Sequence, residues 1–310
     1  MTHYYIGWDV GAWKCTKGRN DSCDALIVMD DNRIVGHHRA NLAETFQRLS
    51  DAHVSERPAT LINHWFELCV GEVQGTKYSA DDQYYIAIDT PLGWPKDFHT
   101  LFNLQVGCEL KHNLSAANLE NSLLYRYTER KKLNSGLSVI VDSIGSQSTK
   151  GILLLRLLCT TNDSWGIWRA GNITLIETYP KACLVRQGFV EWMVGLSFTQ
   201  DIAEIFRVQI CDKPKRYGPK RLIAEDTFDA GVCACVAKAF ARQSPRLVSP
   251  TPNDPSEYFA EGWIFFPDHG QEFVKQSIAD GHTVETCKSG VATFHDAIQT
   301  FKQYLVSRSR

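Results

Sequence analysis

Residues 84–95 read Tyr-Tyr-Ile-Ala-Ile-Asp-Thr-Pro-Leu-Gly-Trp-Pro, and this stretch decides the fold that we expect. The apolar and aromatic run that starts at Tyr84 is typical of a buried β-strand. The run ends at Asp89, and Pro91 follows almost directly and prevents the strand from continuing. The stretch therefore predicts a strand that brings a carboxylate to one edge of a sheet.

Two further stretches end in the same way. Residues 4–10 (YYIGWDV) predict a strand that reaches Asp9, and residues 172–177 (NITLIE) predict a strand that ends at Glu177. A glycine or proline follows each carboxylate within three residues. In an open α/β sheet, ligands bind outside the carboxyl ends of the strands. If these strands are parallel neighbours, we expect their carboxylates to converge on one edge, although a lone Asp in such a place is usually a turn residue.

A fourth carboxylate is available at the start of a helix. Residues 226–242 are small and apolar, which favours a helix packed closely on the sheet, and either Asp226 or Asp229 can face the same edge. Clustered carboxylates repel one another and raise each other's pKa, so a fold that collects them needs a cation. Oxygen ligands select Mg²⁺ or Mn²⁺, and two such ions can clamp the attacking and leaving oxygens of a phosphodiester.

The remaining pattern predicts an α/β fold with a mixed sheet. Residues 24–29 and 33–38 read as strands joined by a short polar turn, which with the first strand makes a three-strand meander. The later strands alternate with helices, which implies parallel crossovers. We expect one domain over residues 1–270 with a helical insertion at about 96–136, and a C-terminal helical extension over 271–310 packed on the same domain.

Composition excludes several classes of protein. The chain has 310 residues, of which 44% are hydrophobic and 22% charged, and a net charge of −2, which argues against tight sequence-independent binding of DNA. Its ten cysteines include no C-x-x-C pair, so we expect small buried side chains rather than a zinc site. The N-terminus lacks the pattern of a secretory signal, and no apolar run is long enough to span a bilayer. We therefore expect a cytoplasmic protein without membrane contact.

Several short motifs resemble a known family. In chain order they are Gly7-Trp8-Asp9, Ile88-Asp-Thr-Pro-Leu-Gly-Trp-Pro95, Arg126-Tyr-Thr-Glu129, Ile176-Glu-Thr-Tyr-Pro180, Asp229-Ala230 and Glu261-Gly-Trp-Ile264. Together they resemble the domain-of-unknown-function 429 (DUF429) family, whose members are described as predicted RNase H-like nucleases. The resemblance covers residues 4 to about 267, and its Ile-Asp-x-Pro-Leu-Gly and Glu-x-Tyr-Pro pieces are the most specific.

The resemblance implies an RNase H-like fold and a metal-dependent nuclease that hydrolyses phosphodiester bonds in DNA or RNA. The family pattern implies that the catalytic residues and ligands of Mg²⁺ or Mn²⁺ are Asp9, Asp89, Glu177 and Asp229. It gives accessory roles to Arg126 and Glu129, which would grip the substrate or brace the site. Enzymes of the RNase H type usually take one carboxylate from their first helix, and here Glu177 is the candidate that replaces it.

Three further features are candidate contacts with a nucleic-acid substrate. Trp94 can stack on a base or a sugar, although packing of its loop on the domain is the simpler interpretation. Residues 213–221 form a basic loop in which Lys215 and Arg216 can contact phosphates, with a solvated loop as the alternative. Residues 130–132 (Arg-Lys-Lys) form a smaller basic patch with the same two interpretations.

Two other classes of function stay open. A phosphotransferase or ATPase of the actin-like class would share the Asp-Val-Gly turn at residues 9–11, but that class needs two related domains, and the sequence shows no internal duplication. A non-catalytic protein could keep the fold in order to bind a nucleotide or a partner. The sequence does not decide between DNA and RNA, and it leaves the oligomeric state open.

Overall fold

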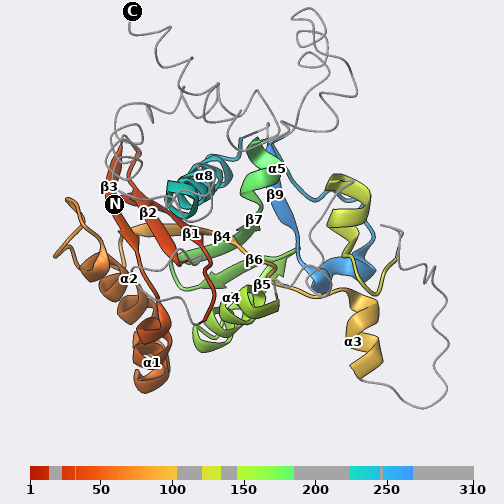
Figure 1. Ribbon diagram of the computed structural model, residues 1–310, viewed down its shortest axis with the longest axis horizontal. Coiled ribbons are helices and arrows are strands. Elements are labelled where there is room, and N and C mark those ends of the chain that lie inside the picture. The colour runs from red at the N-terminus through yellow and green to blue at the C-terminus, as the bar shows by residue number, and fades with distance from the viewer. Residues whose placement is uncertain are drawn as a thin grey trace, which may run out of the picture.

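A mixed β-sheet with helices on both faces forms the centre of the protein (Figure 1). The structure is a computed structural model, and it describes residues 1–13, 23–31, 33–102, 121–133, 145–184, 224–244 and 247–267. The strands are β1 (His3–Asp9), β2 (Ala25–Met29), β3 (Ile34–Arg39), β4 (Gln83–Asp89), β5 (Thr161–Ser164), β6 (Ile167–Ala170), β7 (Ile173–Thr178), β8 (Leu247–Val248) and β9 (Ile264–Pro267). The predicted α/β class is confirmed, and the sheet is compatible with an RNase H-like fold.

The pairing of the strands explains where the carboxylates lie. The spatial order is β3-β2-β1-β4-β7-β6-β5, with β9 beside β7 and β8 beside β9. The first three strands form the predicted antiparallel meander. β1, β4 and β7 are parallel neighbours, so their carboxyl ends meet at one edge of the sheet.

The helices divide between the two faces of the sheet. They are α1 (Ala43–Asp51), η1 (Val54–Glu56), α2 (Arg57–Leu68), α3 (Lys96–Phe102), η2 (Glu129–Leu133), α4 (Gly145–Leu157), α5 (Pro180–Leu184), α8 (Ala224–Ala241) and η3 (Ser256–Glu261). Figure 1 shows α8 across one face and α1, α2 and α4 on the opposite face. No helix in the described part of the chain is long and apolar enough to cross a membrane.

Two apolar cores, one on each face, hold the layers together. Successive residues of a strand point to opposite faces. Tyr5, Ala87 and Ile176 therefore pack on the α8 side. The alternate positions pack on the other side against α1, α2 and α4, and they include Ile6, Trp8, Ile86, Ile88, Ile173 and Leu175. This alternation also decides the face on which each strand-end carboxylate lies.

The closest contact between α8 and the sheet requires a glycine. The predicted helix over 226–242 is observed as α8, and its small residues allow its backbone to approach β1. A Cβ atom added to Gly7 would lie 1.8 Å from the backbone oxygen of Ala230 and 2.4 Å from the backbone nitrogen of Ala234. Because both atoms belong to the helix backbone, no side-chain movement can relieve the clash.

We expect Gly7→Ala to destabilise the fold by about 3 kcal/mol, since overpacking of a rigid core forces the backbone to move. Urea unfolding followed by circular dichroism measures the change. Gly75→Ala is the comparison, because a Cβ at this position meets no atom within 4 Å. The only destabilisation expected there comes from placing alanine at a backbone φ of 86°. A Gly7 variant that is as stable as the Gly75 variant would contradict this account of the α8–β1 contact.

Several features differ from the sequence-based expectations or lie beyond the described residues. The β5–β6 hairpin was not predicted, because its strands are four residues each and β5 carries no apolar residue. Of the insertion at about 96–136, the structure describes α3 and residues 121–133, which contain η2. The C-terminal extension over 271–310 and the basic loop with Lys215 and Arg216 lie outside the described residues.

Candidate metal centre

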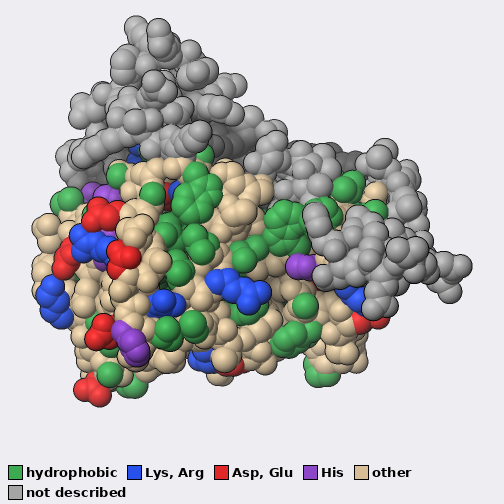
Figure 2. Space-filling model, turned by 90° about the horizontal axis from the view of Figure 1, so that it is seen from below, with side chains coloured by type: hydrophobic (Ala, Val, Ile, Leu, Met, Phe, Trp, Pro, Cys, Tyr) green, Lys and Arg blue, Asp and Glu red, His purple; other side chains and the backbone are tan. Residues whose placement is uncertain are grey.

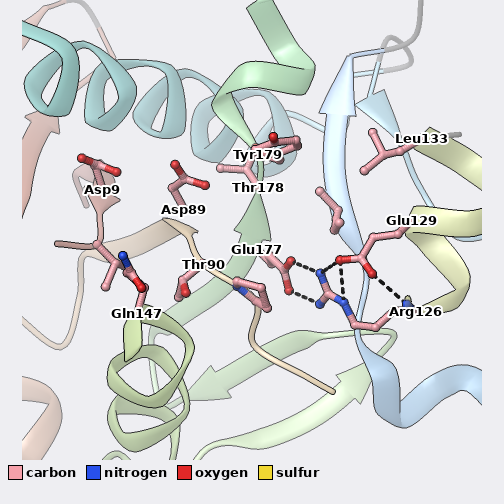
Figure 3. Close-up of a pocket in the computed structure, with 13 residues that line it drawn as sticks. Asp9, Asp89, Thr90, Arg126, Glu129, Leu133, Gln147, Glu177, Thr178 and Tyr179 are labelled. Carbon is pink, nitrogen blue, oxygen red and sulfur yellow. Dashed lines mark hydrogen bonds and ion pairs between the residues drawn. The ribbon is translucent and has the colours of Figure 1, made fainter. Parts of the chain in front are cut away.

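Three aspartates meet beside the end of the central strands. Asp9, Asp89 and Asp229 each offer a carboxylate oxygen, and these oxygens all lie within 4.8 Å of one another. Asp9 ends β1, Asp89 ends β4, and Asp229 lies in the second turn of α8. Figure 3 shows Asp9 and Asp89 side by side, both pointing toward the helix that covers this face. The predicted convergence therefore holds for three of the four carboxylates.

The register and the alternation of the strands explain this arrangement. Asp9 of β1 lies directly opposite Asp89 of β4 in the parallel pair. Asp9 shares its face with Tyr5, and Asp89 shares its face with Ala87, both of which pack in the core beneath α8. The two carboxylates must therefore point toward α8, where Asp229 reaches them. Asp226, the alternative, instead pairs with Arg39 of β3 at 2.6 Å.

The structure differs from the prediction at Glu177. Its partner in the parallel β4–β7 pair is Ile88, not Asp89. Since Ile88 packs against α4 and its neighbours, Glu177 points to the face of the sheet opposite the three aspartates. Figure 3 shows its carboxylate directed away from Asp9 and Asp89 and toward Arg126. Glu177 is thus held by a cation and is not part of the three-aspartate cluster.

Arg126 and two glutamates form a buried ionic network next to the cluster. The Arg126 guanidinium donates to both carboxylate oxygens of Glu177, at 2.7 and 2.6 Å, and to Glu129 at 2.8 Å. Arg126 and Glu129 are each only 1% exposed. Glu177 also accepts a hydrogen bond of 2.8 Å from the backbone N–H of Leu92, in the loop that follows Asp89. The network therefore fixes the ends of β4 and β7, and the buried Arg126 is placed to brace the site rather than to grip a substrate from the surface.

A second buried ion pair, which sequence reasoning missed, supports the turn after Asp9. Asp24 and Lys150 are completely buried and lie 2.7 Å apart. Asp24 also accepts hydrogen bonds from the Trp8 indole N–H and the backbone N–H of Gly11. The only sequence signals were a lone Asp before β2 and a lone Lys in an apolar helix, neither of which identifies a partner.

Burial and mutual repulsion raise the pKa of the clustered carboxyls. For Asp9, burial comes first, followed by the charges of Asp89 and Asp229, and its pKa is raised well above 3.8. Burial and the charge of Glu177 raise the pKa of Asp89 to about 7, although its hydrogen bond with Asp9 opposes the shift. Near neutral pH without metal, the Asp9–Asp89 pair therefore retains a proton that two ordinary carboxyls would have lost.

We expect the Asp89 carboxyl to destabilise the metal-free protein as the pH rises from about 4 to about 7. Its folded-state pKa is raised, so within this window the folded state holds a proton that the unfolded state has released. Unfolding then releases a proton and becomes more favourable as the pH rises, and the effect is constant above about pH 7.

Urea unfolding in EDTA, compared with Asp89→Asn over the same pH range, isolates this group. The free energy of unfolding of the variant should rise relative to that of the original chain between pH 4 and pH 7. If the free energy of unfolding of the variant stays constant or falls relative to that of the original chain over this window, the pKa of the Asp89 carboxyl is not raised in the folded protein.

The donor set fits a hard divalent cation. Mg²⁺ and Mn²⁺ prefer carboxylate oxygens, and a cation relieves the repulsion between the aspartates. Cys233 of α8 lies close enough to the cluster for the charges of Asp89 and Asp9 to act on it. Burial first, and then these charges, raise the pKa of its thiol well above 9.0, so it stays neutral and is a poor metal ligand. The site thus offers oxygen ligands for Mg²⁺ or Mn²⁺.

Asp9 and Asp89 of the cluster line a pocket of about 170 Å³. Its lining includes Asp9, Asp89, Thr90, Pro91, Arg126, Glu129, Leu133, Gln147, Glu177, Thr178, Tyr179 and Ile264. A protein cavity of about 150 Å³ holds one benzene molecule, so this volume suits ions and a small group rather than a whole buried nucleotide. The bulk of a larger substrate would lie outside it.

Two of the remaining candidate contacts, Trp94 and Lys132, have partners within the protein. Trp94 is not part of its lining and stacks on Phe98 with ring centroids 5.0 Å apart, which agrees with the packing interpretation. In the patch at 130–132, Lys132 pairs with Asp254 at 2.6 Å. On the face seen in Figure 2, the basic side chains of the described residues are interspersed with acidic ones and form no continuous basic surface.

The comparisons with known proteins add no family or relative to this picture. The chain matched no family model, no curated protein and no solved structure. The DUF429 resemblance therefore stays a prediction.

Proposed function

We propose that this protein is a nuclease that depends on Mg²⁺ or Mn²⁺ and hydrolyses phosphodiester bonds in nucleic acid. The observation that carries the proposal is the meeting of Asp9, Asp89 and Asp229, from three separate elements, with ligand oxygens within 4.8 Å of one another. A fold gains nothing in stability from gathering buried carboxylates, because each raises the pKa of the others. Such an arrangement is better explained by a ligand that the carboxylates bind.

In this proposal the three aspartates hold the metal. Bound divalent ions would supply Lewis-acid catalysis and lower the pKa of water. The charges of both Asp89 and Asp229 act on Asp9, which is therefore the central candidate ligand. Arg126, through Glu177, would keep the loop after Asp89 in place by the 2.8 Å hydrogen bond to Leu92. Glu177 is therefore proposed as a positioning residue rather than a metal ligand.

A cleavage screen tests the proposal. Single- and double-stranded DNA and RNA oligonucleotides are incubated with the full chain in Mg²⁺, in Mn²⁺ and in EDTA. We expect metal-dependent cleavage of at least one substrate and none in EDTA. Isothermal titration with Mn²⁺ and with ATP runs in parallel. ATP hydrolysis without oligonucleotide cleavage would favour the actin-like class, and failure to bind Mn²⁺ would exclude a metal centre here.

A further inference from the structure

Helix α4 contacts the loops that follow β1 and β4, the two strands that end at metal-ligand candidates. Ser148 Oγ donates a hydrogen bond of 2.8 Å to the backbone oxygen of Pro91, in the loop after β4. Lys150 Nζ donates a hydrogen bond of 3.2 Å to the backbone oxygen of Ala12, in the loop after β1. Both side chains are completely buried. Gln147, in the first turn of the same helix, lines the pocket (Figure 3), so α4 joins the two loops beside the candidate metal centre.

Lys150 also holds the chain on both sides of Asp9, through Asp24. The Lys150 ammonium lies 2.7 Å from Asp24 Oδ2. Asp24 Oδ1 accepts a hydrogen bond of 3.1 Å from the indole N–H of Trp8, which directly precedes Asp9. The same oxygen accepts a hydrogen bond of 3.0 Å from the backbone N–H of Gly11, two residues after Asp9. The ion pair therefore fixes the turn from which the Asp9 carboxylate projects.

Close packing gives both loops little room to move. A Cβ atom added to Gly151 of α4 would lie 2.6 Å from Thr90 Cγ2 and 2.7 Å from Leu92 Cδ2, in the loop after β4. In the loop after β1, a Cβ on Gly11 would lie 2.3 Å from the backbone carbonyl carbon of Cys23. The two loops are thus held by tight contacts as well as by the hydrogen bonds from α4.

Stability alone does not explain why Asp24 and Lys150 are buried beside the cluster. Removing two charges from water costs free energy, and replacing a buried ion pair with apolar residues is often neutral or stabilising. Partners that orient the ligands of a metal, by contrast, change its affinity by about 10- to 100-fold when they are substituted. The pair and the Ser148 hydrogen bond are therefore better explained by the position that they give to the carboxylates.

We propose that Lys150 and Ser148 are positioning residues, through which α4 sets the separation of the Asp9 and Asp89 carboxylates at which they bind one divalent cation. The inference rests on the proposed function and deepens it, because it names the residues that fix the geometry of the metal centre. Neither residue contacts the metal in this proposal. Both act on it through the loops that follow β1 and β4.

The charge of Lys150 and its hydrogen bonds should affect metal binding in opposite directions. An ammonium group repels a cation, so the loss of the charge by itself should strengthen Mn²⁺ binding. Loss of the contacts with Asp24 and Ala12 releases the turn after Asp9 and should weaken it. A positioning role therefore predicts that Lys150→Met binds Mn²⁺ about tenfold more weakly than the original chain.

Isothermal titration with Mn²⁺ tests this in three variants: Lys150→Met, Ser148→Ala, and Asp24→Asn combined with Lys150→Met. Ser148→Ala changes no charge, and the double variant removes one charge of each sign, so it leaves no buried charge unpaired should the single variant fail to fold. All three should bind Mn²⁺ about tenfold more weakly, and the electron paramagnetic resonance spectrum of bound Mn²⁺ should change shape. In urea, the double variant should be more stable than Lys150→Met but should not regain metal affinity.

Two substitutions serve as controls. Ser146→Ala alters an exposed side chain in the first turn of α4. Lys77→Met removes a lysine that pairs with Glu67 at 3.2 Å, where the side chains are 67% and 45% exposed. Both controls should bind Mn²⁺ as the original chain does.

The outcomes separate this inference from the proposed function. Unchanged affinity in Ser148→Ala and in the double variant, or tighter binding by Lys150→Met, would overturn the positioning role and leave the metal centre intact. A double variant that regains stability and affinity together would also overturn it. Mn²⁺ binding without cleavage would overturn the nuclease alone, because these titrations do not depend on cleavage. Failure of the original chain to bind Mn²⁺ would overturn both.

Discussion

Asp9→Asn should abolish Mn²⁺-dependent cleavage, with a loss of at least about a thousandfold, while the protein stays folded. Loss of a carboxylate that contacts the metal removes several kcal/mol of electrostatic stabilisation from the transition state, and each 1.4 kcal/mol is a factor of ten. Asp9 has several acidic neighbours, since Asp89, Asp229, Asp226 and Asp24 all raise its pKa after burial does. The variant should also bind Mn²⁺ much more weakly in isothermal titration.

The same substitution should stabilise the metal-free protein above pH 7. A neutral amide replaces a buried carboxylate whose pKa is raised. The substitution therefore removes from the folded state both a buried charge and its repulsion by the neighbouring aspartates. Thermal unfolding in EDTA should give a higher Tm for Asp9→Asn than for the original chain. The matched control is Asp51→Asn at the exposed end of α1, which should change neither cleavage nor Mn²⁺ binding. Full activity of Asp9→Asn would refute the metal centre.

Arg126→Gln should destabilise the fold by about 3–5 kcal/mol, because it leaves Glu177 and Glu129 buried without their cation. The two glutamates contact the guanidinium at 2.6–2.8 Å and have side chains 4% and 2% exposed. Burial already raises the pKa of Glu177, and the guanidinium is the largest influence that lowers it. The stability of Arg126→Lys should lie between those of the original chain and of Arg126→Gln. An ammonium keeps the positive charge but cannot make the paired, planar contact with Glu177.

Urea unfolding measures the effect, with Arg33→Gln as the control. Arg33 also pairs with a glutamate, Glu72, but the two side chains are 53% and 60% exposed. Exposed pairs contribute about 0–1 kcal/mol, so this variant should be nearly as stable as the original chain. Equal stabilities of the Arg126→Gln and Arg33→Gln variants would show that the buried network does not hold the ends of β4 and β7 together.

Local sequence was sufficient for the strands that carry the site and for two of the three metal-ligand candidates. The apolar runs before Asp9 and Asp89, and the glycine or proline after them, predicted parallel strands that end at carboxylates, as observed. The small residues of 226–242 predicted the helix that packs closely on the sheet. These features depend on residues that are close in the chain. The two-residue repeat of a strand and the 3.6-residue repeat of a helix can therefore be recognised in a single sequence.

Sequence could not decide between carboxylates that occupy nearly equivalent local positions. Asp226 and Asp229 are three residues apart on one helix and face similar directions. In the structure, Arg39 of β3 and the backbone N–H of Cys23 engage Asp226, whereas Asp229 joins the cluster. Glu177 ends its predicted strand as Asp89 does, but β7 continues to Thr178 and pairs with β4 in a register one residue out of phase, so the Glu177 side chain points to the other face.

The sequence by itself therefore determined the α/β sheet, the strand ends at Asp9 and Asp89, and the edge at which they meet. Only the tertiary structure determined which carboxylates share a face, that Arg126 neutralises Glu177, and that the buried Thr90 hydroxyl has no hydrogen-bond partner among the described residues. The physical reason is that strand ends follow from local backbone preferences. Ion pairs and unpaired buried atoms depend instead on strand register and on contacts between residues far apart in the chain.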